Sequence, residues 1–145
     1  MATNLNPSPQ VIIERLHKAQ NQHDLDAFVE CFAQDYQSEQ PLHPDRAFRG
    51  REQVRKNWSS LFSEIPDFQS ELLRTAVVDE TVWAEWHWYG TRAVGGQFDW
   101  RGVTLFGIQD DCIVWGRLYM EPVQETGGGI DAAVKGMTHG SPQER

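Results

Sequence analysis

The residues best suited to chemistry lie in the segment 82–91, VWAEWHWYGT, where one residue separates Glu85 from His87. In an extended strand, residues two apart point to the same face, with Cα atoms about 7 Å apart. Apolar walls raise the pKa of a carboxylic acid and a neighbouring carboxylate raises that of an imidazole, so such a pair can transfer protons near neutral pH. The alternative is that both side chains face water on a strand whose other face is buried.

Length and composition limit the classes of protein to consider. The 145 residues fit a single domain, 1–145, with one core. Aromatic residues make up 11% of the chain and include six Trp, which indicates an aromatic interior or pocket. The formal net charge is -8, and Lys and Arg do not cluster. We therefore expect no nucleic-acid partner and no anionic membrane surface, because both attract clustered basic residues.

The two cysteines give no sign of a metal site. Cys31 and Cys112 lack the short spacing that holds zinc or iron, so we expect neither a metal nor a cofactor. Cys31 lies on the apolar side of a predicted helix, as a small buried hydrophobe would. The first ten residues have no basic start followed by an apolar run, and no segment has the length of a membrane span. These features predict a cytoplasmic protein.

Three helices are predicted ahead of the sheet, over residues 9–22, 24–34 and 51–65. Ser8 followed by Pro9 is a helix start, and Asp24 can cap the second helix. The third helix stops before Pro66, which cannot continue it. Residues 35–40, DYQSEQ, alternate weakly and predict a short edge strand.

Four longer strands are predicted over residues 68–78, 81–90, 98–109 and 112–121. Their connections are short, so consecutive strands must be antiparallel. Helices followed by a meander indicate an α+β domain with helices on one face of a curved sheet. Both sheet faces carry large apolar side chains, so we expect a second copy to cover the other face as a homodimer. The core spans about 8–123, and the tail, 124–145, carries a short helix.

The order of elements, with AFVECFAQDY, FRGREQVRKNW, IPDF, EWHWYGT and RGVTLFGIQDDCIVWGRLYMEP, resembles the SnoaL-like branch of the nuclear transport factor 2-like superfamily. The resemblance covers roughly residues 11–122. It implies a cone-shaped sheet wrapped around a pocket, closed by N-terminal helices and commonly dimeric. Polyketide cyclases, ketosteroid isomerase, limonene epoxide hydrolase, dehydratases and non-enzymatic binding modules share this fold, so the fold alone does not decide function.

Comparison with the active-site residues of the family argues against epoxide hydrolysis as the activity of this chain. Epoxide hydrolases of the superfamily carry an aspartate on the last long strand, where the matching segment GRLYM has Leu118. Their Arg and Asp on an earlier strand match Glu85 and His87, and their Asn matches Glu39. Epoxide hydrolysis is therefore not expected. Cyclases of the family also use an aspartate near the position of Leu118, which argues against cyclase activity in particular.

The resemblance instead implies a different polar set in the pocket. Glu85 and His87 would act as general base and acid, with Glu39 as a polar partner, on a small apolar carbonyl compound. Isomerisation, cyclisation or dehydration without a cofactor would suit such a set. The alternative is a ligand-binding dimer with no chemistry. The expected pocket walls are Tyr36, Trp58, Trp86, Trp88, Trp100 and Leu118.

Strand pairing does not decide to which face of the sheet the side chains of Glu85 and His87 point. With tight turns and no bulge, Glu85 and His87 share a face with Arg117 and not with Leu118. Either a bulge shifts the register and the pair points into the pocket, or the neighbouring tryptophans line the pocket. In the second arrangement the pair joins Arg117 at the dimer face.

Overall fold

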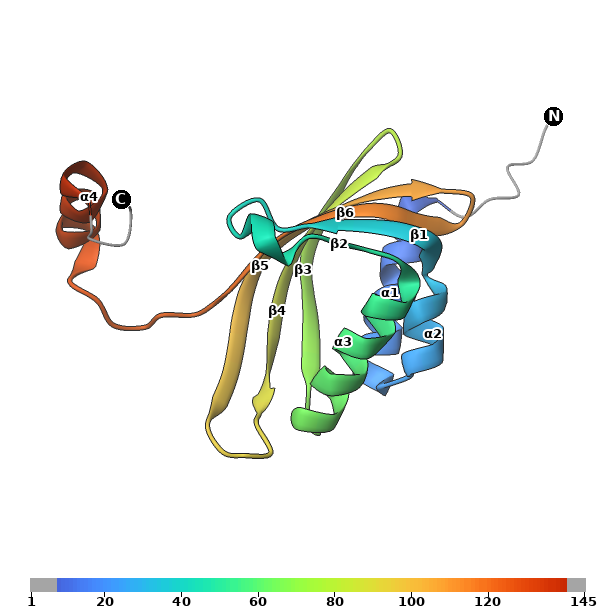
Figure 1. Ribbon diagram of the computed structural model, residues 1–145, viewed down its shortest axis with the longest axis horizontal. Coiled ribbons are helices and arrows are strands. Elements are labelled where there is room, and N and C mark those ends of the chain that lie inside the picture. Colours follow the sequence, from blue (N-terminus) through green and yellow to red (C-terminus); the bar gives the residue numbers. More distant parts are fainter. Residues whose placement is uncertain (1–7, 141–145) are drawn as a thin grey trace.

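Local signals fix where the helices begin. The computed structural model describes residues 8–140 and contains α1 (Pro9–Gln22), α2 (Leu25–Glu30) and α3 (Arg51–Glu64). The Ser8 side chain accepts a hydrogen bond from the Val11 N–H, and Asp24 accepts one from the Ala27 N–H at 3.1 Å. These side chains satisfy N–H groups that have no partner within a helix. All three helices lie on one side of the sheet (Figure 1).

Six strands form one open, curved sheet in the order β2-β1-β6-β5-β4-β3 (Figure 1). β1 and β6 are parallel, and the other neighbouring pairs are antiparallel. The strands are β1 (Phe32–Glu39), β2 (Phe48–Arg49), β3 (Gln69–Val78), β4 (Thr81–Thr91), β5 (Gln97–Gln109) and β6 (Cys112–Pro122), with a 3-10 helix η1 (Pro44–Arg46) before β2. This arrangement confirms the predicted α+β fold.

The second helix is shorter than predicted. It ends at Glu30 rather than near Gln34, and β1 already starts at Phe32. Phe32 pairs with Ile113 of β6, and Arg51 donates two hydrogen bonds to the Phe32 carbonyl, at 3.0 and 2.8 Å, so the chain already belongs to the sheet where a longer helix would continue. The prediction of an edge strand was also wrong, because residues 48–49 form β2 and leave β1 between β2 and β6.

The register of the meander decides which side chains share a face. The β4–β5 loop is longer than a two-residue turn, so Ala84 pairs with Thr104. An irregularity after Gly107 shifts β6 by one residue, so Thr104 pairs with Leu118 instead of Arg117. The two differences cancel between β4 and β6, so the even-numbered residues of β4 share the concave face with Leu118, as the pairing without a bulge predicts. Thr104 and Phe106 of β5 are the residues that change face and join them.

Aromatic side chains fill the space between the concave face and the helices. Trp86 is fully buried, and its indole N–H donates to Thr104 Oγ1 at 2.8 Å. The Phe28 and Trp58 ring centroids are 4.4 Å apart, and those of Trp58 and Trp88 are 5.3 Å apart. One network of rings therefore connects α2, α3 and β4.

The tail forms the short helix that the sequence predicts, α4 (Gly129–His139). It lies away from the sheet and the other helices in Figure 1. Its side chains are exposed, including those of Ile130, Val134 and Met137. Within residues 8–140, no helix has the length and apolar character needed to cross a membrane.

The buried hydrogen bond between Trp86 and Thr104 gives a prediction on stability. Thr104→Val should lower the free energy of unfolding by about 1–3 kcal/mol, because it leaves a buried indole N–H without an acceptor. In a Trp86→Phe background the same change should cost less, since no donor remains. Urea unfolding of the four proteins measures this coupling. Equal costs in the two backgrounds would contradict it.

Candidate functional site

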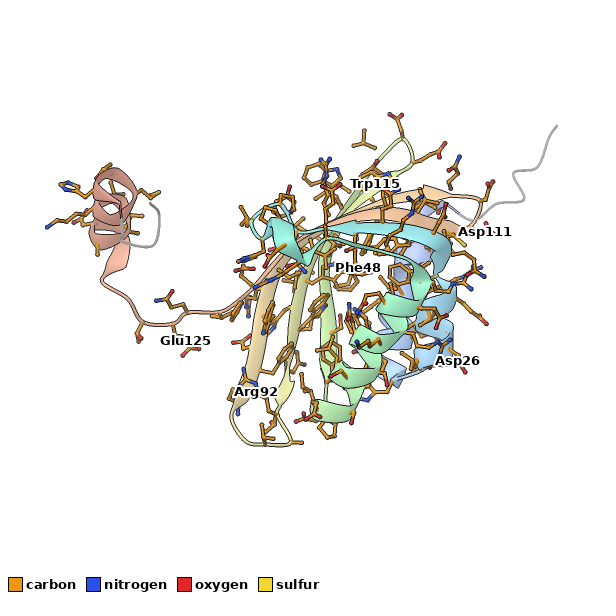
Figure 2. The ribbon with its side chains drawn as sticks, viewed as in Figure 1. Asp26, Phe48, Arg92, Asp111, Trp115 and Glu125 are labelled. Atoms are coloured by element: carbon orange, nitrogen blue, oxygen red, sulfur yellow. The ribbon has the colours of Figure 1, made fainter. Side chains whose placement is uncertain are left out.

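A cavity of about 80 Å³ lies between the concave face and the helices. Its rim includes Gln40, Phe48 and the exposed Asn57. Figure 2 shows Phe48 on the helix side of the sheet and Trp115 on the opposite side. The whole wall comprises Leu16, Gln20, Phe28, Phe32, Tyr36, Ser38, Gln40, Phe48, Val54, Asn57, Trp58, Trp86, Trp88, Thr104, Phe106 and Leu118.

The polar groups of this wall are uncharged. Thr104 Oγ1 accepts the Trp86 hydrogen bond, while Gln20 Oε1 and Trp88 Nε1 are buried without a hydrogen-bond partner. Gly116 leaves room for the Tyr36 hydroxyl, since a Cβ at that position would collide with it. A ligand or water that reached the unpaired groups would gain the hydrogen bonds that they lack.

Most of the expected wall residues lie around this cavity. Tyr36, Trp58, Trp86, Trp88 and Leu118 all line it. The sixth, Trp100, does not, because its ring stacks on Phe98 further along β5, with centroids 5.7 Å apart. Whether any of these side chains contacts a ligand stays a prediction.

The three expected catalytic residues do not reach the cavity. Glu39 on β1 and Glu85 and His87 on β4 occupy the alternate positions, whose side chains point to the outer face of the sheet. Their sequence neighbours, Ser38 and the tryptophans on either side of His87, take the inward positions. The expectation that these three side chains point into the pocket was therefore wrong. Residues of opposite parity on a strand cannot serve the same face.

Glu85 and His87 belong to a charged cluster on the outer face. His87 Nδ1 lies 2.8 Å from Glu71 Oε1, and Nε2 lies 2.7 Å from Asp99 Oδ1. The two carboxylates thus hold the His87 ring from both of its nitrogens. Glu85 pairs with Arg74 of β3 at 3.1 Å rather than with Arg117. Side chains of β3, β4 and β5 are thus joined across the sheet.

Several functional candidates escaped the sequence analysis. Gln20 and Asn57 line the cavity, yet each looks like an ordinary polar residue of a helix. A usable signal for Gln20 is its position one helical turn after Leu16, on the apolar stripe of α1. His17 and His23 were not singled out either. Their Nε2 atoms lie 2.7 Å from the Ser70 carbonyl oxygen and 2.8 Å from the Phe68 carbonyl oxygen, respectively.

The chemistry available in the cavity follows from its one ionisable side chain. Among the wall residues, all within 8–140, only Tyr36 can ionise. Burial raises the pKa of its phenol to about 12, and Ser38 beside it lowers the pKa by less. Tyr36 is therefore a neutral hydrogen-bond donor at pH 7. In the described part of the chain, no group of three or more His, Cys, Asp and Glu is placed to hold a metal ion.

The raised pKa of Tyr36 predicts a loss of stability in alkali. The phenol ionises near 10 in the unfolded chain and only near 12 in the folded one. Between these values folding takes up a proton, so the contribution of Tyr36 is complete below pH 10 and falls by about 1.4 kcal/mol per pH unit between pH 10 and pH 12. Urea unfolding from pH 8 upwards, carried out in a Cys31→Ser background because the raised pKa of Cys31 adds its own slope from about pH 9, should show this slope, and Tyr36→Phe should remove it. A variant with the same slope as the wild type would contradict the assignment.

Solved structures with the same fold support the topology. The chain is similar to IdmH, a candidate polyketide cyclase from Streptomyces antibioticus, at 19% identity and TM-score 0.69, over 79% of this chain and 93% of that one. It is similar to AclR, a candidate hydroxylase from Streptomyces galilaeus, at 16% identity and TM-score 0.68, over 78% and 88% of the two chains.

A third similar structure contains a ligand. RV0760c from Mycobacterium tuberculosis, in complex with estradiol-17beta-hemisuccinate, matches at 15% identity and TM-score 0.67, over 78% of this chain and 94% of that one. No curated protein sequence matches the chain. Residues 13–115, more than half of the chain, match the SnoaL-like domain. The protein therefore belongs to the SnoaL-like domain family.

Proposed function

We propose that the protein binds a small, uncharged, largely apolar molecule in the cavity between the helices and the concave face, and does not change it chemically. The observation that carries this proposal is the composition of the wall: rings, aliphatic side chains and neutral polar groups, with no Asp, Glu, Lys, Arg or His among the described residues that line it. A charged ligand would lose its hydration there without finding a counter-charge.

Acid-base catalysis is the weaker alternative for this cavity. Family members include isomerases and cyclases, and proton transfer at neutral pH needs a group that titrates near that pH. Glu85 and His87 lie across the sheet from the cavity, and the pKa of Tyr36 is about 12. The estradiol-17beta-hemisuccinate bound to RV0760c is a precedent within the fold for a ligand with a large apolar ring system, although that ligand also carries a free carboxyl group.

The size of the cavity says how a ligand would enter. At about 80 Å³ it is smaller than the roughly 300–1,000 Å³ of drug-sized sites. A larger ligand must therefore displace part of the wall. We expect Phe48 to be the residue displaced, because β2 has only two residues and pairs only with β1.

Binding should depend on the neutrality of the wall. With 2-naphthol as probe, Leu118→Asp should raise the dissociation constant at least about tenfold, because the new carboxylate is costly to bury. The quenching of tryptophan fluorescence reports binding, since Trp58, Trp86 and Trp88 line the cavity. The anion 2-naphthoate should bind the wild type more weakly than 2-naphthol.

The matched control is His87→Gln, which changes a polar side chain on the outer face. It should leave the affinity for 2-naphthol unchanged, and circular dichroism should show both variants folded. A loss of affinity in His87→Gln but not in Leu118→Asp would place the ligand elsewhere and sink the proposal. Conversion of a carbonyl substrate by the wild type would overturn the claim that no chemistry occurs.

We also propose that a second copy of the chain covers the outer face of the sheet. Trp83 and Tyr89 on β4 are 46% and 37% exposed there. The same face carries charges of both signs, as in Glu39 and Arg117, which are neighbours across β1 and β6. A two-fold interface places one patch against itself, so mixed charges suit it better than charges of one sign.

Trp83→Lys should convert a dimer to a monomer, because it replaces an apolar contact with two like charges across the two-fold axis. Light scattering on a sizing column measures the mass. Val94→Lys is the matched control: Val94 is also exposed and apolar but lies in the β4–β5 loop. A wild type that is monomeric at micromolar concentration, or a Trp83→Lys variant that stays dimeric, would refute the proposed interface.

A further inference from the structure

The two cysteines, far apart in sequence, meet where the helical layer joins the sheet. Cys31 is the residue between α2 and β1, and Cys112 is the first residue of β6. Phe32 and Ile113, the next residue in each case, pair directly in the parallel β1–β6 ladder. The Ile113 N–H donates to the Cys31 carbonyl at 2.8 Å, so the backbones of the two cysteines are locked side by side.

Their side chains face one hollow. Cys31 and Cys112 both line a solvent-open hollow between α1, α2 and the β5–β6 turn. Figure 2 marks that turn with Asp111, at the end of the sheet where α2 runs into β1. Cys112 is half-buried, whereas Cys31 is buried and its thiol donates to the Ala27 carbonyl at 3.5 Å. An oxidant can therefore reach Cys112 first.

The spacing suits a covalent bond between them. Neighbouring strands lie about 4.7–4.9 Å apart, and disulfides join Cα atoms about 4.4–6.8 Å apart. Burial raises the pKa of Cys31 to about 11, Arg15 lowers it, and the nearby Cys112 adds a smaller increase. The thiols are thus close enough to influence each other electrostatically, and Cys31 is the poorer nucleophile at neutral pH.

We propose that Cys31 and Cys112 are a modification site that a peroxide converts to an intramolecular disulfide. The Cys112 thiolate attacks one peroxide oxygen, the O–O bond breaks, and a sulfenic acid and water form. The Cys31 sulfur then attacks the Cys112 sulfur and displaces the hydroxyl group as a second water. Two thiols are oxidised, one hydrogen peroxide is reduced, and the proton of each thiol ends in water.

The bond would tie the helical layer to the sheet. It closes the long loop from residue 31 to residue 112, which contains α3 and the strands β1 to β5. Closing a long loop restricts the unfolded chain and raises the melting temperature by several degrees. It also fixes the C-terminal end of α2, the helix that contributes Phe28 to the aromatic network.

The test treats the reduced, full-length protein with hydrogen peroxide and follows intact mass, peptides and melting temperature. The expected product is a single chain, not cross-linked to another, whose mass is lower by two hydrogen atoms. Its peptides containing Cys31 and Cys112 should be joined, and its melting temperature should be higher until dithiothreitol reduces the bond. Before oxidation, iodoacetamide should label Cys112 much faster than Cys31.

Two variants serve as controls. Cys31→Ser and Cys112→Ser should each form no internal cross-link and show no rise in melting temperature on treatment. Because the wild-type peptide map alone decides the question, a variant that fails to fold does not weaken the test. Oxidation of Cys112 to the sulfinic acid while Cys31 stays a thiol, or a cross-link only between two chains, would overturn the proposal.

Discussion

Burial of large rings against a curved sheet is the constraint on which the rest of this structure depends. Trp86 and Trp88 point inward from β4. The helices pack over them through Trp58 of α3, whose ring lies against Trp88, and Phe28 of α2, whose ring lies against Trp58. Such rings do not tile a curved surface without gaps. The cavity is the space that remains between them, so its shape and its neutral wall both follow from the same packing.

The two faces of the sheet differ in charge: the inner face is neutral and the outer face carries ionisable side chains. Inside, the only ionisable wall residue, Tyr36, is held neutral by burial. Outside, His87 lies between Glu71 and Asp99, and Arg74 pairs with Glu85. In this chain Glu85 and His87 of β4 stand on the outer face, across the backbone from the two buried tryptophans.

The fold could be predicted from the sequence further than the site could. Helix starts at Ser8 and Asp24 and the four long strands depend on local residue patterns, and those patterns suffice. The end of α2 coincides with the pairing of Phe32 with Ile113 of β6, a contact that no local pattern contains. The inward direction of Thr104 depends on the length of the β4–β5 loop, and Leu118 stays inward only because an irregularity after Gly107 offsets that length.

The site was harder to predict than the fold, because each one-residue irregularity in a meander reverses the sheet face to which every later residue points. The pairing argument placed Glu85 and His87 on the face of Arg117, and they are there, although Thr104 is on the other face. Gln20 and Asn57 come from helices, whose polar residues give no sign of which ones border a cavity.

The outer charged cluster has a consequence for how the chain finds its native pairing. Sliding β4 by one residue would move His87 and Glu85 beneath the helices and turn Trp86 and Trp88 out to water. That misfolded state would lose the ring packing and bury charges away from Glu71, Asp99 and Arg74 at the same time. The alternation of tryptophan and charged residues along β4 thus raises the free energy of a shifted strand in two ways, and so favours the native register of this strand in the sheet.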